Sequence, residues 1–184
     1  MKNTILIFFL FICVIKTRAQ EQPAESKVYS NNLSLGIHLN NFQNDFGYGL
    51  SLTSPFFPHT GVALKASGNI AYNDGVLKND SISNWRPYYS FQFGTIATVA
   101  MIAKCIRVYG AGGMIILFPN STVSSNKTEF GGYGSWGFEF IINPRMSYYL
   151  ELGGVGTGAR ADKAAGKSLY SNGFLTTAGM HFYF

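Results

Sequence analysis

The segment 174–184 alternates strictly between two sets of residues. One face, read at every second position, carries Phe174, Thr176, Ala178, Met180, Phe182 and Phe184. The other face carries Leu175, Thr177, Gly179, His181 and Tyr183. A period of two residues is typical of a β-strand whose faces meet different environments. The segment therefore predicts a strand with one apolar face.

The same alternation recurs in seven earlier segments. The eight predicted strands cover 33–40, 46–52, 62–72, 89–99, 106–116, 130–142, 147–153 and 174–184. The connections alternate between two kinds. The polar and mostly long ones are 41–45, 73–86, 118–129 and 159–172. The tighter ones are 54–60, 101–104 and 143–146. Short turns at one end and longer loops at the other are typical of outer-membrane β-barrels.

The positions of the charged residues inside the strands decide what the apolar face meets. Lys65, Arg107, Glu139 and Glu151 all fall on the polar face. The opposite face carries almost no charge, which is unfavourable in water and favourable in lipid. We therefore predict an all-β fold, an eight-stranded antiparallel up-and-down transmembrane β-barrel.

Three other folds fit the sequence less well. A soluble sandwich or lipocalin-like barrel would bury its apolar face and place charge outside. A helical membrane protein would use 88–103 and 105–118, but Lys104 and Arg107 interrupt that region, and its alternation suits strands. A helical hairpin joined to a soluble domain meets the same objection.

The N-terminal segment has a different pattern. Lys2 precedes an unbroken apolar run over 5–15, and Thr17 and Ala19 occupy the small-residue positions before a cleavage site. This layout predicts a cleaved signal peptide over 1–19, followed by a short periplasmic segment over 20–32 and the barrel over 33–184. The alternative is an uncleaved anchor, which would need about 20 apolar residues.

Composition agrees with a membrane barrel and excludes several other classes. Aromatic residues make up 16% of the chain and charged residues 12%, about half of the usual ~25%. Mean hydropathy is only +0.10, because inward polar residues of a barrel dilute the average. No basic patch suggests nucleic-acid binding. Without the signal peptide only Cys105 is left, so no internal disulfide or cysteine metal site is expected, and no cofactor.

These features resemble a known family. The Ala19-Gln20 junction, the strands over 33–184 and the last five residues are similar to small bacterial outer-membrane β-barrels of the OmpX/OmpA type. The resemblance implies outer-membrane lipid and lipopolysaccharide as surroundings. It also implies delivery by periplasmic chaperones and the barrel-assembly machinery, with Met180, Phe182 and Phe184 as the C-terminal assembly signal.

The inward charges are the first candidate site. Lys65, Arg107, Glu139 and Glu151 are predicted to lie at similar depth, near the short turns. The favoured interpretation is an ion-pair network that fills a narrow barrel. The alternative is a gate for small solutes or a proton-linked site.

Two further motifs are of types that can carry chemistry. His38 and His181 point inward on the first and last strands, but no serine follows His38 in the spacing that lipid-acyl chemistry would favour, so polar packing is preferred. The run 161–168 fits a relaxed phosphate-loop pattern. It lacks the strand-to-helix context that the motif needs, and we expect no nucleotide.

The predicted function is that of a non-enzymatic integral outer-membrane protein with both termini in the periplasm. Its structural or surface-interaction role would lie in the loops 73–86, 118–129 and 159–172. The last of these carries Arg160, Lys163 and Lys167 against Asp162, which suits anionic lipopolysaccharide headgroups. The alternatives are a narrow channel for small or apolar solutes and a barrel enzyme that modifies lipid A.

Overall fold

A computed structural model describes residues 32–43, 45–75, 84–164 and 171–184. The predicted signal peptide and all but the last residue of the predicted periplasmic segment lie outside these residues. Within them there is no helix long and apolar enough to cross a membrane.

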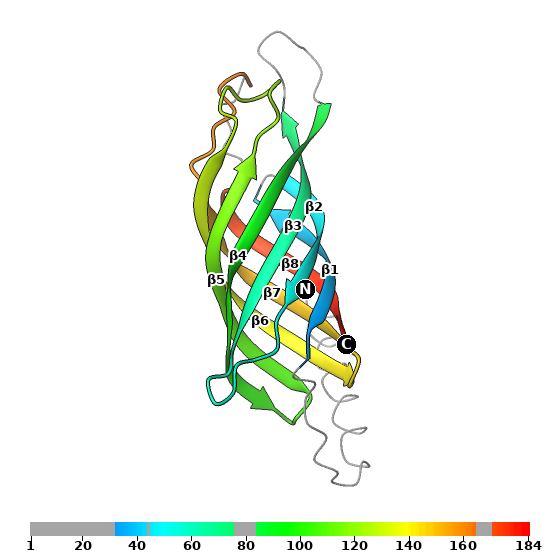
Figure 1. Cartoon of the computed structure of the whole chain (residues 1–184). Coiled ribbons are helices and arrows are strands. Elements are labelled where there is room, and N and C mark those ends of the chain that lie inside the picture. Colours follow the sequence, from blue (N-terminus) through cyan, green and yellow to red (C-terminus); the bar gives the residue numbers. More distant parts are fainter. Residues whose placement is uncertain (1–31, 44, 76–83, 165–170) are drawn as a thin grey trace, which may run out of the picture.

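Eight antiparallel strands form one closed barrel, and each strand pairs with its neighbours in the chain (Figure 1). The strands are β1 (Ser34–Phe42), β2 (Asp45–Thr53), β3 (Val62–Gly75), β4 (Asn84–Ile102), β5 (Ile106–Phe118), β6 (Glu129–Asn143), β7 (Met146–Gly156) and β8 (Gly173–Tyr183). The barrel closes where β1 pairs with β8, with Ser34 opposite Tyr183 and Phe42 opposite Leu175. The predicted fold class is therefore confirmed.

The two faces of the wall follow the alternation in the sequence. Along β1, buried and exposed positions alternate without exception from Ser34 to Phe42. Large apolar side chains are exposed on the outside of every strand, for example Leu50 at 57%, Phe93 at 60% and Trp136 at 58%. No charged side chain faces outward among the strand residues whose side chains the structure describes. The outer wall therefore has the chemistry of a surface solvated by lipid.

The ends of the barrel are uneven. β4 has 19 residues and β1 has 9, and the β3–β4 hairpin rises well beyond the β1–β2 hairpin (Figure 1). The connection predicted over 41–45 is shorter than expected, because β1 continues to Phe42 and β2 already starts at Asp45. Asp45 is consequently a buried strand residue and not a loop residue.

Inward-facing glycines allow the wall to bend tightly. A Cβ atom added at Gly94 would meet the backbone of Gly112 and Gly113, and one added at Gly153 would meet the backbone of Gly134. Both contacts are closer than real Cβ atoms approach a backbone. Glycine at these two positions thus permits the curvature that a narrow barrel needs.

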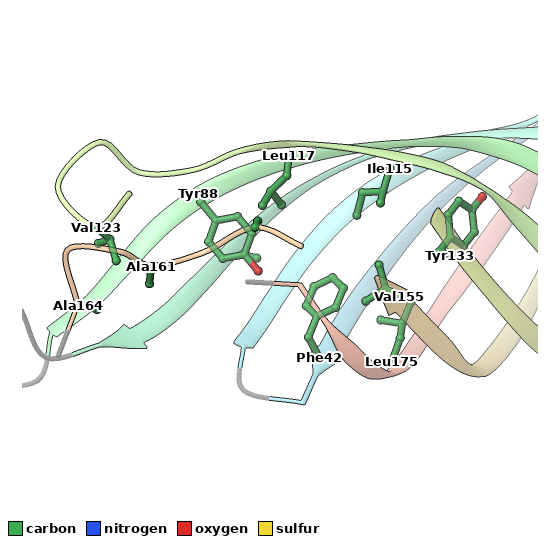
Figure 2. Packing of buried hydrophobic residues seen from close by; sticks show 12 residues of the cluster. Phe42, Tyr88, Ile115, Leu117, Val123, Tyr133, Val155, Ala161, Ala164 and Leu175 are labelled. Atoms are coloured by element: carbon green, nitrogen blue, oxygen red, sulfur yellow. The ribbon is translucent and has the colours of Figure 1, made fainter. Parts of the chain in front are cut away.

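The half of the lumen away from the chain's C-terminus is an apolar core (Figure 2). Its wall residues include Phe42, Ile115, Leu117 and Leu175. Its remaining members come from the connections that follow β5 and β7, and they are Val123, Ala159, Ala161 and Ala164. These connections were predicted as polar loops, yet part of each packs inside the barrel mouth.

Candidate functional site

The half of the lumen near the C-terminus contains the four charged residues singled out in the sequence. Lys65 on β3 and Glu151 on β7 form an ion pair across the lumen, with 2.5 Å between Nζ and Oε1. The Tyr109 hydroxyl donates a hydrogen bond of 2.8 Å to the same carboxylate oxygen. Lys65 and Glu151 are each only 4% exposed. Water therefore does little to screen this pair.

Glu139 is the centre of the second ion pair. Its carboxylate accepts hydrogen bonds from Arg107 Nη1 at 2.9 Å, Ser147 Oγ at 2.5 Å and His181 Nδ1 at 3.0 Å. The Tyr183 hydroxyl also donates to it. Arg107 and Glu139 are direct partners in the β5–β6 register. One buried carboxylate thus ties together β5, β6, β7 and β8.

Aromatic rings connect the two ion pairs. The Tyr149 ring stacks on the His181 ring with centroids 4.2 Å apart, and Lys65 Nζ lies 5.3 Å from the Tyr149 centroid. At the outer end, the Arg107 guanidinium lies 4.5 Å from the centroid of the Phe56 ring. The structure therefore brings all four charges and His181 into one assembly, which we call the charged plug. Two cations and two anions balance within it.

His38 lies apart from this plug. Its Nε2 atom donates to Asn69 Oδ1 at 2.7 Å, and Asn40 Nδ2 donates to the same oxygen at 2.7 Å. Thr177 in turn donates to Asn40 at 2.8 Å. The two predicted lumen histidines therefore occupy separate hydrogen-bond networks, and His38 is hydrogen-bonded to an amide and not to a carboxylate of the described residues.

An acid, a base and a nucleophile do lie close together around His181. Glu139 binds His181 Nδ1, while His181 Nε2 has no hydrogen-bond partner among the described residues and Ser51 Oγ lies beside the Tyr149 hydroxyl. His181 Nε2 and Ser51 Oγ border the space that a Cβ of Gly36 would fill. A Ser–His–Glu order of this kind can support acyl transfer when a substrate reaches the serine. The adjoining cavity, at the end of the barrel near the C-terminus, however, measures about 10 Å³, enough for about one water molecule.

A third buried carboxylate, Asp45, lies at the opposite end of the lumen. It accepts hydrogen bonds from the Tyr88 hydroxyl at 2.8 Å and from the Ser171 backbone N–H at 2.9 Å. The Asn73 amide donates to its other oxygen. Asp45 thereby anchors the end of the β7–β8 connection to β2, β3 and β4. Sequence reasoning missed this role, because it placed Asp45 in a loop.

The connections after β5 and β7 form one unit above the apolar core, which we call the loop platform (119–128 and 157–164). Asp162 accepts from the Ser125 backbone at 2.8 Å and from its hydroxyl at 2.6 Å. Lys163 donates from its backbone to Val123 O at 3.1 Å and from Nζ to Ser121 O at 2.8 Å. The Ser125 hydrogen bonds hold the pKa of the Asp162 carboxyl below its usual range.

The remaining candidate motifs are the run 161–168 and the C-terminal residues. In the run 161–168, Ala161 and Ala164 are buried in the apolar core, and 165–168 lie outside the described residues. At the C-terminus, Phe184 is 71% exposed, and Met180 and Phe182 share its outward face. Their role as an assembly signal stays a prediction.

No family model and no curated protein matches this chain. Among solved structures, the N-terminal β-barrel domain of Pseudomonas aeruginosa OprF is similar, with a TM-score of 0.56 and 13% identity over 84% of this chain and 98% of that one. The Yersinia pestis outer-membrane protein Ail in a phospholipid nanodisc is also similar, with a TM-score of 0.51 and 14% identity over 83% of this chain and 99% of that one. Likeness at such low identity concerns the fold alone. The chain has the fold of the small outer-membrane β-barrels, as its sequence predicted.

Proposed function

We propose that the mature chain is a non-enzymatic, integral outer-membrane protein whose work is done by its loop platform at the cell surface. The wall supports the membrane location. Large apolar side chains cover its outside, and the described strand side chains place no charge there. A water-exposed surface of that kind would aggregate, whereas a bilayer solvates it.

The observation that carries the proposal is the filling of the lumen at both ends. The charged plug occupies one end, and the apolar core with the two loop segments occupies the other. Eight strands enclose a space just wide enough for side chains to fill. Side chains that fill both ends of the lumen would obstruct the passage of ions, which supports a closed barrel over the channel alternative.

The same filling argues against a lipid-modifying enzyme. The arrangement of Ser51, His181 and Glu139 is enclosed, and its cavity of about 10 Å³ is far too small for an acyl chain. His38 is hydrogen-bonded to the Asn69 amide and to no carboxylate of the described residues. Acyl transfer needs the nucleophile to reach a lipid. Here the Ser51 hydroxyl and both lumen histidines face the packed lumen.

The loop platform supports a role in surface contact. Its two segments are joined by four hydrogen bonds through Ser125, Asp162 and Lys163 and are held down by buried apolar residues. A pre-ordered surface loses little entropy when it binds. In this proposal the platform is extracellular, the short turns and both termini are periplasmic, and periplasmic chaperones and the barrel-assembly machinery deliver the chain.

Two measurements test the proposal. The refolded barrel should migrate differently on gels before and after boiling, and it should cause no reproducible conductance steps in planar lipid bilayers. Identical mobility in both states would contradict a closed membrane barrel. A reproducible open step with the wild-type chain would contradict the closed lumen.

A further inference from the structure

The outer face of β5, β6 and β7 has a patch without side chains. Six outward-facing glycines lie there on adjacent strands, namely Gly110, Gly112, Gly132, Gly134, Gly154 and Gly156. In the registers of these strands, Gly112 lies opposite Gly134, and Gly134 lies opposite Gly154. Elsewhere the outer wall is rich in large apolar side chains. We call this patch the glycine face.

Packing within the chain does not require five of these six glycines; only Gly112 is tight, because a Cβ added there would lie 3.3 Å from the Tyr133 carbonyl oxygen. A Cβ atom added at Gly110 or Gly134 would meet no atom within 4 Å, and one added at Gly154 would make an ordinary contact of 3.6 Å. The described glycines with positive φ are Gly61, Gly158 and Gly173, none of them in the patch. A lipid-facing glycine also forgoes the apolar contact that a larger side chain would make. The reason for glycine at the other five positions therefore lies outside the chain.

The patch is hollow. A groove of about 470 Å³ lies over the part formed by Gly110, Gly112 and Gly134, with backbone as its floor and with Trp136, Leu152 and Thr95 at its edges. Trp136 is 58% exposed and stands beside the groove. Such a shape suits a slender apolar group that lies directly against the backbone.

An exposed cation, Arg160, lies in the chain segment that follows β7. β7 ends at Gly156, but burial continues to alternate, with Thr157 and Ala159 buried and Gly158 and Arg160 exposed. Arg160 is therefore the exposed cation that follows the β7 glycines in the chain, four residues after Gly156. The positive φ of Gly158 turns the backbone between them, so Arg160 lies closer to Gly156 than the ~13 Å that four extended residues would span.

The other charges of this loop segment are engaged within the platform. Asp162 is bound by Ser125, and the Lys163 ammonium is bound by Ser121 O. Arg160 is exposed, and no hydrogen bond or ion pair joins its side chain to the residues that the structure describes. Its guanidinium is therefore available for an anion, and phosphate is the anion whose geometry it matches well.

We propose that the glycine face and Arg160 together bind one anionic lipid of the surrounding leaflet. A hydrocarbon chain lies in the groove, and a headgroup phosphate pairs with Arg160. The inference rests on the proposed membrane location. A second copy of the chain fits less well, because a symmetric dimer in a membrane has its two-fold axis along the membrane normal. The two Arg160 side chains would then face one another at the same depth.

Native mass spectrometry of the refolded barrel in detergent tests this site, with bisphosphorylated lipid A as the probe and phosphatidylcholine as the zwitterionic comparison. Arg160→Gln should weaken lipid A binding about fivefold, the equivalent of ~1 kcal/mol for one cation near a membrane surface. Gly134→Leu, which fills the groove, should weaken it at least as much. Arg160→Gln should leave phosphatidylcholine binding unchanged.

Two matched controls keep the same chemistry at other places. Ala66→Leu places the same leucine side chain on the outside of β3, and Lys104→Gln removes one exposed cation at the opposite end of the barrel. Both should bind lipid A within twofold of the wild-type chain. Gel mobility before and after boiling verifies that each variant is folded, and Arg160→Gln decides the question alone if Gly134→Leu fails to fold.

The outcomes separate this site from the proposed function. A wild-type chain without heat-modifiable mobility would overturn both. A folded barrel whose Arg160→Gln and Gly134→Leu variants bind lipid A like the wild type would overturn only the lipid site. A dimer mass lost in Gly134→Leu and retained in Arg160→Gln would assign the groove to a second copy, which also overturns it.

Discussion

Replacing Glu139 by leucine would remove the acceptor on which four donors of the charged plug converge. Arg107 is only 6% exposed, so the substitution leaves a buried guanidinium without its counterion. Breaking a buried ion pair in this way costs about 3–5 kcal/mol of unfolding free energy. Ser147, His181 and Tyr183 also lose an acceptor, which places the expected loss toward the upper end of that range.

A second substitution, Arg107→Met, tests whether the loss comes from the unpaired Arg107 charge. Adding Arg107→Met to Glu139→Leu removes the stranded charge and fills its space with apolar atoms. The double variant should therefore be more stable than Glu139→Leu alone by about 2 kcal/mol, because a buried pair replaced by apolar residues is often close to neutral. The double variant would thus lose less unfolding free energy than Glu139→Leu alone.

Equilibrium unfolding in urea, with the barrel in phosphatidylcholine vesicles, measures these differences. The two tryptophans of the chain report unfolding by fluorescence. Arg145→Met on the exposed β6–β7 turn serves as a control and should change stability by less than about 0.5 kcal/mol. If the effects of Arg107→Met and Glu139→Leu simply added, the two residues would not be coupled, and the described plug would be refuted.

Three further outcomes are expected. Asp45→Ala strands three donors and should cost about 1–3 kcal/mol in urea unfolding, and no measurable loss would show that it does not anchor the loop. Gly153→Ala forces a Cβ against neighbouring backbone and should cost about 1–3 kcal/mol, whereas Gly134→Ala should be nearly neutral; equal effects would refute the curvature argument. The Asp162 carboxyl has a lowered pKa in the folded state, so its bonds with Ser125 stabilise the platform above pH ~4 and are lost as the pH falls through the folded pKa. Hydrogen exchange of the loop platform should therefore accelerate on acidification in the wild type more than in Asp162→Asn, and equal acceleration would contradict this role.

The strands and their faces could be predicted because lipid outside and packed side chains inside impose a period of two on every strand. Lys65, Arg107, Glu139 and Glu151 were placed inward by that period alone, and the structure places them inward. The pairing of Arg107 with Glu139 follows from the register of one hairpin. The pairing of Lys65 with Glu151 does not, because it crosses the lumen between residues that only barrel closure brings together.

The apolar core at the loop end was not predicted. Its loop members are Val123 and three alanines, whose short side chains give a weak signal in segments otherwise rich in serine, asparagine and glycine. They are buried because the loops fold back into the mouth, which depends on contacts far apart in the sequence. Asp45 was missed for a related reason. Its polar neighbours indicated a loop, while its partners come from three distant segments.

In the proposed orientation, the packing of the platform into the barrel mouth divides the extracellular surface into two kinds of position. Val123, Ala161 and Ala164 belong to the protein's interior, so variation there is limited to small apolar residues, as in any core. Exposed neighbours such as Lys127 and Arg160 carry no such constraint from packing. A lineage under pressure from antibodies or phages could therefore change the chemistry of this surface at single exposed residues while its outline stayed the same.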